Sequence, residues 1–183
     1  MIRKNILFFL IVLMFLSAGI CWSVSDTTDQ SVTLNVDEIA VVDVSGQPGA
    51  MYITAPTTGG QNPLSDLDQT TSLTYTSTVA SGSTRTITFQ MGSSDVVPAG
   101  TTLGLGLGAP QEGNQGTPGV QTSAIVITTS AQPVVTGIGS TATGTGTNKG
   151  CILGFTFFVN NVGNLVAGEN KGITLTYTLT DDQ

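Results

Sequence analysis

The sequence predicts an all-β protein, an antiparallel β-sandwich of about ten short strands. One observation is that apolar residues alternate with Thr or other polar residues in many short runs; this period of two marks a strand with one buried and one solvated face. The other is that clusters of Gly, Pro, Ser and Asn separate these runs, and that no stretch is typical of a helix. Immunoglobulin-like and jelly-roll-like sandwiches both fit this pattern, and a closed β-barrel is the alternative.

The strands follow one another along the chain without an intervening helix. In chain order, we expect them at Ser31–Val36, Ile39–Val44, Ala50–Thr54, Ser72–Thr78, Thr84–Met91, Thr101–Leu107, Ser123–Thr129, Pro133–Ile138, Cys151–Asn160 and Ile173–Thr180. The three longest segments between them, 55–69, 108–119 and 139–150, are expected to be loops. None of these loops is long enough to be a separate domain, so residues 39–183 are predicted to form one β-sandwich domain.

Residues 1–25 have the features of a signal peptide. Arg3 and Lys4 precede an apolar run of eleven residues, and Ser23 and Ser25 are small residues suited to a cleavage site. An uncleaved membrane anchor is the alternative, although a spanning helix needs about 20 residues. Cys21 allows a lipoprotein reading, but Ile20 before it is bulky where a lipidation signal requires a small residue. We therefore expect a secreted protein, found outside the cell or on its surface.

The chain that follows residue 25 is strongly acidic. It holds all twelve acidic residues but only Arg85, Lys149 and Lys171 as basic residues, which gives a net charge near −9. Nucleic acids and anionic membranes both require clustered Lys and Arg, so neither is an expected partner. The same charge keeps an exported domain soluble.

Cys151 is the single cysteine after residue 25, so this part of the chain cannot form an internal disulfide. It begins an apolar run, "CILGFTFFV", at residues 151–159. This setting favours a buried thiol that acts as a small apolar side chain. An intermolecular disulfide is the alternative.

The sequence contains no histidine, which removes the commonest general base and the commonest metal ligand. We expect no enzymatic activity, no cofactor and no dedicated metal site. The carboxylates of Asp66 and Asp68, or of Asp37 and Glu38, could ligate calcium, but neither pair has the carboxylate density of a calcium loop.

Glycan binding is an alternative function, since exported β-sandwiches often bind sugars through exposed aromatic rings. The one tryptophan, Trp22, lies in the expected signal peptide. Among the remaining aromatic residues, only Tyr52 stands outside an apolar strand face or run. A monomeric adhesion or glycan-binding module would therefore depend largely on Tyr52.

Residues 26–38 are expected to be an N-terminal extension. Its strand presents Val32, Leu34 and Val36 on one face. This strand either pairs within its own subunit or adds to the sheet of a neighbouring copy, as in donor-strand complementation of pilus subunits. We predict the second arrangement, in which the extension is a donor strand and the protein is a homopolymer, a pilus-like or fimbria-like extracellular filament.

Several segments resemble a group of uncharacterised exported proteins of Gram-negative bacteria. They are "SVTLNVDEIAVVDVSG" (31–46), "LTYTSTV" (73–79), "VVPAGTTL" (96–103), "VVTGIGSTATGTGTNKG" (134–150) and "ITLTYTLTDD" (173–182). The resemblance implies export and an all-β fold, and it implies no particular activity. The chain departs from that group between Gly150 and Ile173, where it has an additional apolar strand and a loop.

Overall fold

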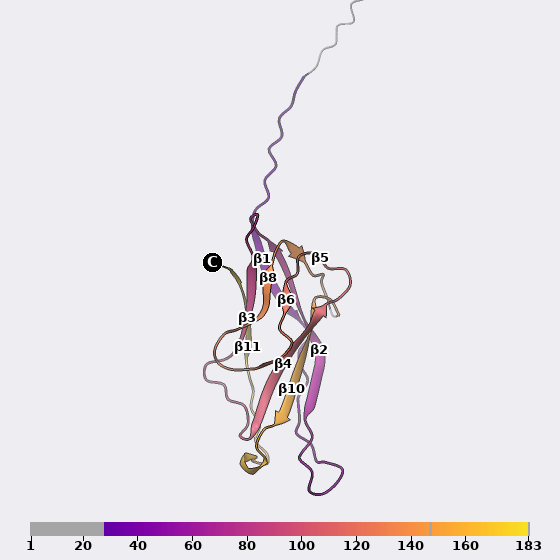
Figure 1. The fold of residues 1–183 in the computed structure, drawn as a ribbon, viewed down its shortest axis with the longest axis vertical. Helices are drawn as coiled ribbons and strands as arrows, with labels where there is room; N and C mark the ends of the chain where they lie inside the picture. The colour runs from indigo at the N-terminus through magenta and orange to yellow at the C-terminus, as the bar shows by residue number, and fades with distance from the viewer. Residues whose placement is uncertain (1–27, 147, 183) are drawn as a thin grey trace, which may run out of the picture. The chain divides into compact units, whose positions relative to one another are not determined.

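The computed structural model describes residues 28–146 and 148–182, and it consists of two antiparallel β-sheets packed face to face (Figure 1). The described chain falls into two units, residues 28–35 and residues 36–182, and all the strands belong to the second unit. The sheets stay open, so the predicted β-sandwich is confirmed and the alternative of a closed barrel is wrong. The expected signal peptide, with Cys21 and Trp22, lies outside the described residues.

The larger sheet has seven strands, with β2 and β10 at its centre. Its members are β1 (Ile39–Ser45), β2 (Asp66–Thr78), β4 (Thr101–Pro110), β5 (Gln115–Gly116), β7 (Ile125–Val126), β9 (Thr141–Ala142) and β10 (Cys151–Val159). β1 pairs with one edge of β2 and has no second neighbour, so β1 is an edge strand. β9 and β10 pair with β2, and β10 also pairs with β4.

The smaller sheet has four strands in the order β11-β3-β8-β6. They are β3 (Arg85–Met91), β6 (Val120–Gln121), β8 (Gln132–Ile138) and β11 (Leu175–Asp181), and a short 3₁₀ helix, η1 (Val162–Asn164), precedes β11. β11 pairs with β3 alone, so it is also an edge strand. The Phe89 and Tyr177 rings pack with their centroids 4.8 Å apart, which adds a side-chain contact between these two strands.

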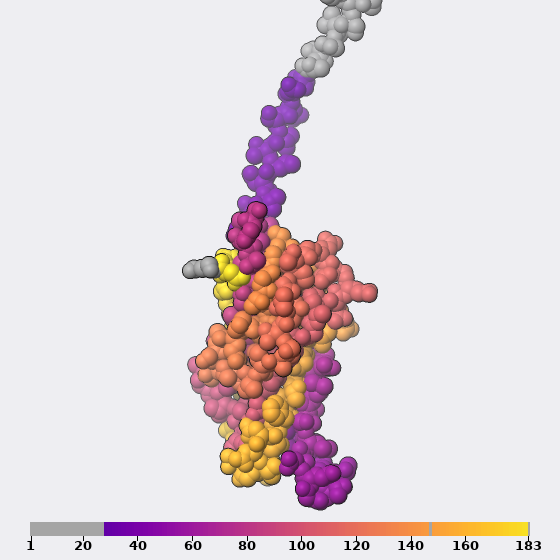
Figure 2. All heavy atoms as spheres, in the orientation of Figure 1, coloured from indigo at the N-terminus to yellow at the C-terminus, as the bar shows by residue number. Residues whose placement is uncertain are grey.

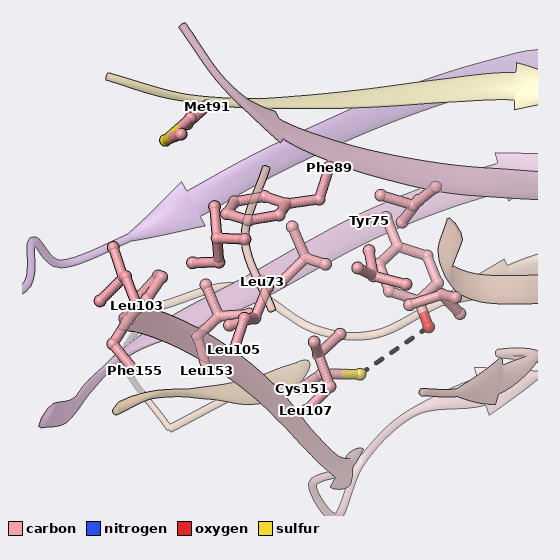
Figure 3. Packing of buried hydrophobic residues seen from close by; sticks show 14 of the residues in the cluster. Leu73, Tyr75, Phe89, Met91, Leu103, Leu105, Leu107, Cys151, Leu153 and Phe155 are labelled. Atoms are coloured by element: carbon pink, nitrogen blue, oxygen red, sulfur yellow. Dashed lines mark hydrogen bonds between the residues drawn. The ribbon is translucent and has the colours of Figure 1, made fainter. Parts of the chain in front are cut away.

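The core lies between the two sheets and follows the alternation of the sequence. Ile87, Phe89 and Met91 of β3 are buried in one cluster with Leu103, Leu105 and Leu107 of β4. Figure 3 shows Phe89 and Met91 opposite these leucines. Burying each such side chain contributes about 1.5–3 kcal/mol, and this apolar packing holds the two sheets together. The remaining buried apolar side chains are those of Leu73, Tyr75, Ile127, Val134, Val135, Ile138, Cys151, Leu153 and Phe155.

Three of the expected strands differ from the structure. Residues 31–36 form no strand, 50–54 contribute only a single bridge between Thr54 and Leu64, and 123–129 form only the two-residue β7. The expected loop 55–69 includes the first four residues of β2. The expected loops 108–119 and 139–150 contain the end of β4 and the two-residue strands β5 and β9. A strand exists only where a neighbour completes its hydrogen bonds, and residue alternation does not report whether that neighbour is present.

Candidate functional site

A large apolar groove lies between the edge strands β1 and β11. It has a volume of about 1260 Å³, and Val44 of β1 and Leu175 and Tyr177 of β11 form parts of its sides. Leu103, Leu153 and Phe155 from the centre of the larger sheet also line it. Leu103, Leu153 and Phe155 are buried, so they lie beneath the groove, and Val44, Leu175 and Tyr177 pack against the same core.

The groove is closed at one end. β1 and β11 contact each other, and the guanidinium of Arg85 joins them there. Its Nε donates to Asp181 Oδ1 at 2.6 Å, and its Nη1 donates to the carbonyl of Ile39. Glu38 adds a longer ion pair to the same guanidinium at 3.4 Å. These contacts hold the first residue of β1 beside the end of β11.

Away from Arg85 the groove continues past the end of β1, where the chain leaves its pairing with β2 after Ser45 and turns at Gly46. The backbone of Gly46 has a φ of 87°, and a Cβ at this position would lie 2.9 Å from the Thr70 carbonyl oxygen. A left-handed conformation so close to a neighbouring backbone favours glycine. Beyond this turn, the segment 47–55 continues as one wall of the groove.

Two carboxylates fix this wall to β2. Asp68 Oδ2 accepts a hydrogen bond from Gly49 N at 3.0 Å, and Asp66 Oδ2 accepts one from Tyr52 N at 3.0 Å. Slight burial raises the pKa of Asp68, but hydrogen bonds from Thr70 N, Gly49 N and the Thr70 hydroxyl outweigh it and leave this pKa below its usual value. The two aspartates, considered above as calcium ligands, therefore bind backbone groups. Among the described residues there is no cluster of three or more Cys, Asp or Glu side chains that could hold a metal ion.

The opposite wall is formed by residues 165–173, which lead into β11. Glu169 Oε2 accepts a hydrogen bond from Ala99 N at 3.1 Å, and Asp95 Oδ2 accepts one from Thr174 N at 2.6 Å. The bond from Ala99, together with the Lys171 ammonium 3.2 Å away, lowers the pKa of Glu169. Figure 2 shows this part of the chain, in gold, at the same end of the molecule as the purple loop that follows β1.

Thr71, a residue at the groove, has a buried hydroxyl that forms no hydrogen bond among the described residues. The side chain is 1% exposed and lines the groove, and its Oγ1 has no partner among the described residues. A buried polar group without a partner costs about 1–3 kcal/mol. Because this oxygen is itself inaccessible, it is not offered on the surface of the groove.

The predicted donor residues are exposed. Val32, Leu34 and Val36 are 72%, 87% and 85% accessible to solvent, more than most apolar side chains of the described residues. No element among residues 28–146 and 148–182 covers their alternating apolar face.

Cys151 lies in the core. Its side chain is fully buried, and its Sγ lies 3.9 Å from the Tyr75 hydroxyl (Figure 3). Burial raises the pKa of this thiol to about 11, and the hydrogen bond from Tyr75 offsets only part of that effect. Cys151 therefore occupies the position expected for a buried thiol that acts as a small apolar side chain. An intermolecular disulfide through Cys151 would require the sandwich to open.

Tyr52, the aromatic residue on which the glycan alternative depends, is 62% exposed and lines the groove. Phe155, from the apolar run that was expected to be buried, is in the core, whereas Phe157 is partly buried at the groove. Residue alternation correctly indicated the inward face of β11. It gave no signal that this face would line a groove, because the approach of β1 to β11 is a property of the topology.

No protein-family model matches the sequence, and no curated protein or solved structure shows significant similarity to it. The resemblance to exported Gram-negative proteins therefore stays a prediction. In the part of the chain that the structure describes, we find no helix of the length and apolarity needed to cross a bilayer.

Proposed function

We propose that this protein is a secreted structural subunit that polymerises into a pilus-like extracellular filament, and that residues 26–38 of each copy add a strand to the next copy. The observation that carries the proposal is the exposure of Val32, Leu34 and Val36, which is 72% or more at each residue. Their alternation is that of a strand with one buried face, yet within the single chain this face is not buried.

The physical reason for association is the removal of this face from water. Burying each of the three side chains contributes about 1.5–3 kcal/mol, and pairing with a sheet edge also satisfies the backbone groups of the segment. Ordering the segment opposes this gain, at about 1–2 kcal/mol for each residue fixed. A contact in which the two partners use different surfaces repeats without closing and produces a filament.

The test is to express the full chain in a bacterial host that exports it, and to examine the secreted protein by size-exclusion chromatography and electron microscopy. We expect filaments from the wild type and monomers from the triple variant V32S/L34S/V36S. The matched control is T33S/N35S, which changes the polar face of the same segment and is expected to form filaments. Filaments from the triple variant would contradict the proposal.

Tyr52 supports one alternative, a monomeric surface adhesion or glycan-binding module. Its ring is exposed at the rim of the groove, where it could stack on a sugar. A wild-type protein that stays monomeric and binds immobilised glycans, with binding lost in Y52A, would favour this alternative over the filament.

A further inference from the structure

We infer that the groove between β1 and β11 is the acceptor site for residues 31–36 of a second copy, which pair antiparallel with β11 of the first. This inference rests on the proposed function and names the surface that receives the donor strand. In the inferred register, Val36, Leu34 and Val32 of the donor lie opposite Ile173, Leu175 and Tyr177 of the acceptor.

The backbone of β11 has free hydrogen-bonding groups on the side away from β3. Thr174 O accepts a hydrogen bond from Gly92 N, and Asp182 N donates to Thr84 O. In an antiparallel pair every second residue points its N–H and C=O at the partner. The even-numbered residues of β11 therefore bond to β3, and the backbone groups of Leu175, Tyr177 and Leu179 point to the free edge.

The apolar faces of donor and acceptor coincide in this arrangement. Leu175 and Tyr177 are partly buried and point toward the core, whereas Thr176 and Thr178 are exposed. Residues directly opposite each other in neighbouring strands point to the same face of the sheet. The donor's three apolar side chains would therefore enter the groove, and its Thr33 and Asn35 would face solvent beside Thr176 and Thr174.

The direction of the donor follows from the contact that joins β1 and β11 at one end of the groove. Arg85 holds Ile39 and Asp181 together at one end, so a chain that continues into a folded domain can enter only at the other end, near Val44 and Ile173. The donor's own domain begins directly after residue 38 and must stay outside the groove. Its residues therefore run antiparallel to β11 and parallel to β1, and antiparallel pairing with β11 is the slightly more stable of the two ladders.

Residues 31–36 of the same copy could lie along β1 only in the reverse direction, which is parallel to β11. Glu38 is held at the closed end by Arg85 and by a hydrogen bond from Ala80 N. Val44 lies six residues further along β1, about 20 Å away at about 3.3 Å per residue. If the chain turned back at residues 37–38, Val36 would lie beside Ile39, and only Ser31 would reach Val44. A second copy has no such restriction.

The dimensions of the groove also favour a strand over a small molecule. Its volume of about 1260 Å³ exceeds the range of about 300–1,000 Å³ typical of small-molecule sites. A peptide strand can also form main-chain hydrogen bonds with the free backbone edge of β11 along one side of the groove.

Disulfide trapping tests this register without changing the apolar face. In the inferred ladder Thr33 lies opposite Thr176, in a pair that forms no mutual hydrogen bonds. The Cα atoms of such a pair are about 4.5 Å apart. A disulfide spans Cα distances of about 4.4–6.8 Å, so cysteines at these two positions could form one. The full-length double variant T33C/T176C is secreted, oxidised and separated on denaturing gels without reductant. We expect a ladder of multimers that collapses to monomer with reductant. The control T33C/T180C displaces the second thiol by four residues, about 13 Å, and is expected to remain monomeric on the gel, as are both single-cysteine variants.

Each other outcome has a separate meaning. A band of monomer size whose two added thiols are oxidised would show that the segment occupies its own groove, and would overturn the inference. Wild-type filaments without cross-linking of T33C/T176C would overturn the acceptor site and leave the proposed function standing. Stronger cross-linking of T33C/T180C would overturn the register. A wild type that does not self-associate would overturn the proposed function, and the inference with it.

Discussion

Arg85 Nε lies 2.6 Å from Asp181 Oδ1, although the arginine side chain is 4% exposed and the aspartate side chain is 69% exposed. The same guanidinium donates to the carbonyl of Ile39 and, at 3.2 Å, to that of Thr78. Arg85 therefore joins an edge strand of one sheet to an edge strand of the other. It is the only charged side chain that is buried among the described residues.

Replacing Arg85 is expected to destabilise the fold. R85M keeps much of the apolar volume but leaves the partly buried carbonyls of Ile39 and Thr78 without their donor, and we expect the free energy of unfolding to fall by about 2–4 kcal/mol. Urea denaturation followed by circular dichroism measures this loss. The control is D181N, because the amide oxygen of Asn still accepts a hydrogen bond from Arg85. Since Asp181 is exposed, we expect D181N to lower the free energy of unfolding by less than about 1 kcal/mol. Equal losses in the two variants would contradict this role for Arg85.

Asp68 is expected to control the order of the groove wall at residues 47–55. In D68A the Gly49 amide loses its acceptor, so we expect faster hydrogen exchange at Gly49 with little change in the core strands. The matched control is D43A, because Asp43 is an exposed carboxylate that accepts only from the neighbouring Val44 N. Unchanged exchange at Gly49 in D68A would show that other contacts hold this wall.

The wall is also expected to respond to acid. The pKa of Asp68 is lower in the folded protein than its usual value of 3.8, so the folded state favours the ionised carboxylate. Its contribution to stability is therefore present above that value and is lost as the pH falls through the lower, folded-state pKa. Protection of the Gly49 amide should decrease over this acidic range in the wild type and stay constant in D68A.

Gly150 is expected to tolerate no side chain. Its φ is 66°, and a Cβ at this position would lie 2.0 Å from the carbonyl oxygen of Leu73. A left-handed conformation alone costs a residue with a side chain about 1–2 kcal/mol, and the overlap adds to this cost, so G150A should lower the free energy of unfolding by more than about 2 kcal/mol. Gly172 has no neighbouring atom within 4 Å, and G172A should change stability by less than about 0.5 kcal/mol. Thermal unfolding of both variants would measure the difference.

The thiol of Cys151 is expected to be unreactive until the protein unfolds. At pH 8 it is buried and protonated, so a thiol reagent should label it only in denaturant. Its pKa rises from 9.0 to about 11 on folding, so its contribution to stability is constant below about pH 9 and is lost as the pH rises through about 11. The wild type should therefore lose more stability than C151A between these values. Rapid labelling of the native protein would contradict this position for Cys151.

A synthetic peptide of residues 28–38 is expected to stop filament growth. It carries the donor segment without a domain behind it, so a subunit whose groove it fills cannot accept the next copy. Light scattering of a growing sample should show elongation fall as the peptide concentration rises. A peptide with Leu34→Asp and Val36→Asp is the control, because charged side chains are costly to bury in an apolar groove. Equal inhibition by both peptides would contradict a role for the apolar face.

The alternation of apolar and polar residues in the sequence correctly predicted which face of each long strand is buried. Ile87, Phe89 and Met91 are all buried, and the residues between them are less so. The two-residue strands β5, β6 and β9 could not be predicted, since a period of two needs about four residues to be recognised. Alternation at residues 31–36 is as regular as in β3, yet no strand forms there, because the sequence pattern specifies a face and does not specify a partner. The groove depends on which strands become edges, and that is decided by contacts distant in sequence.

The burial of Cys151 determines how this protein can be prepared. Among the described residues it is the only cysteine, and the sandwich contains no disulfide in that part of the chain. Within the described residues a reductant has no disulfide to break, so this part of the protein can be handled with or without reductant.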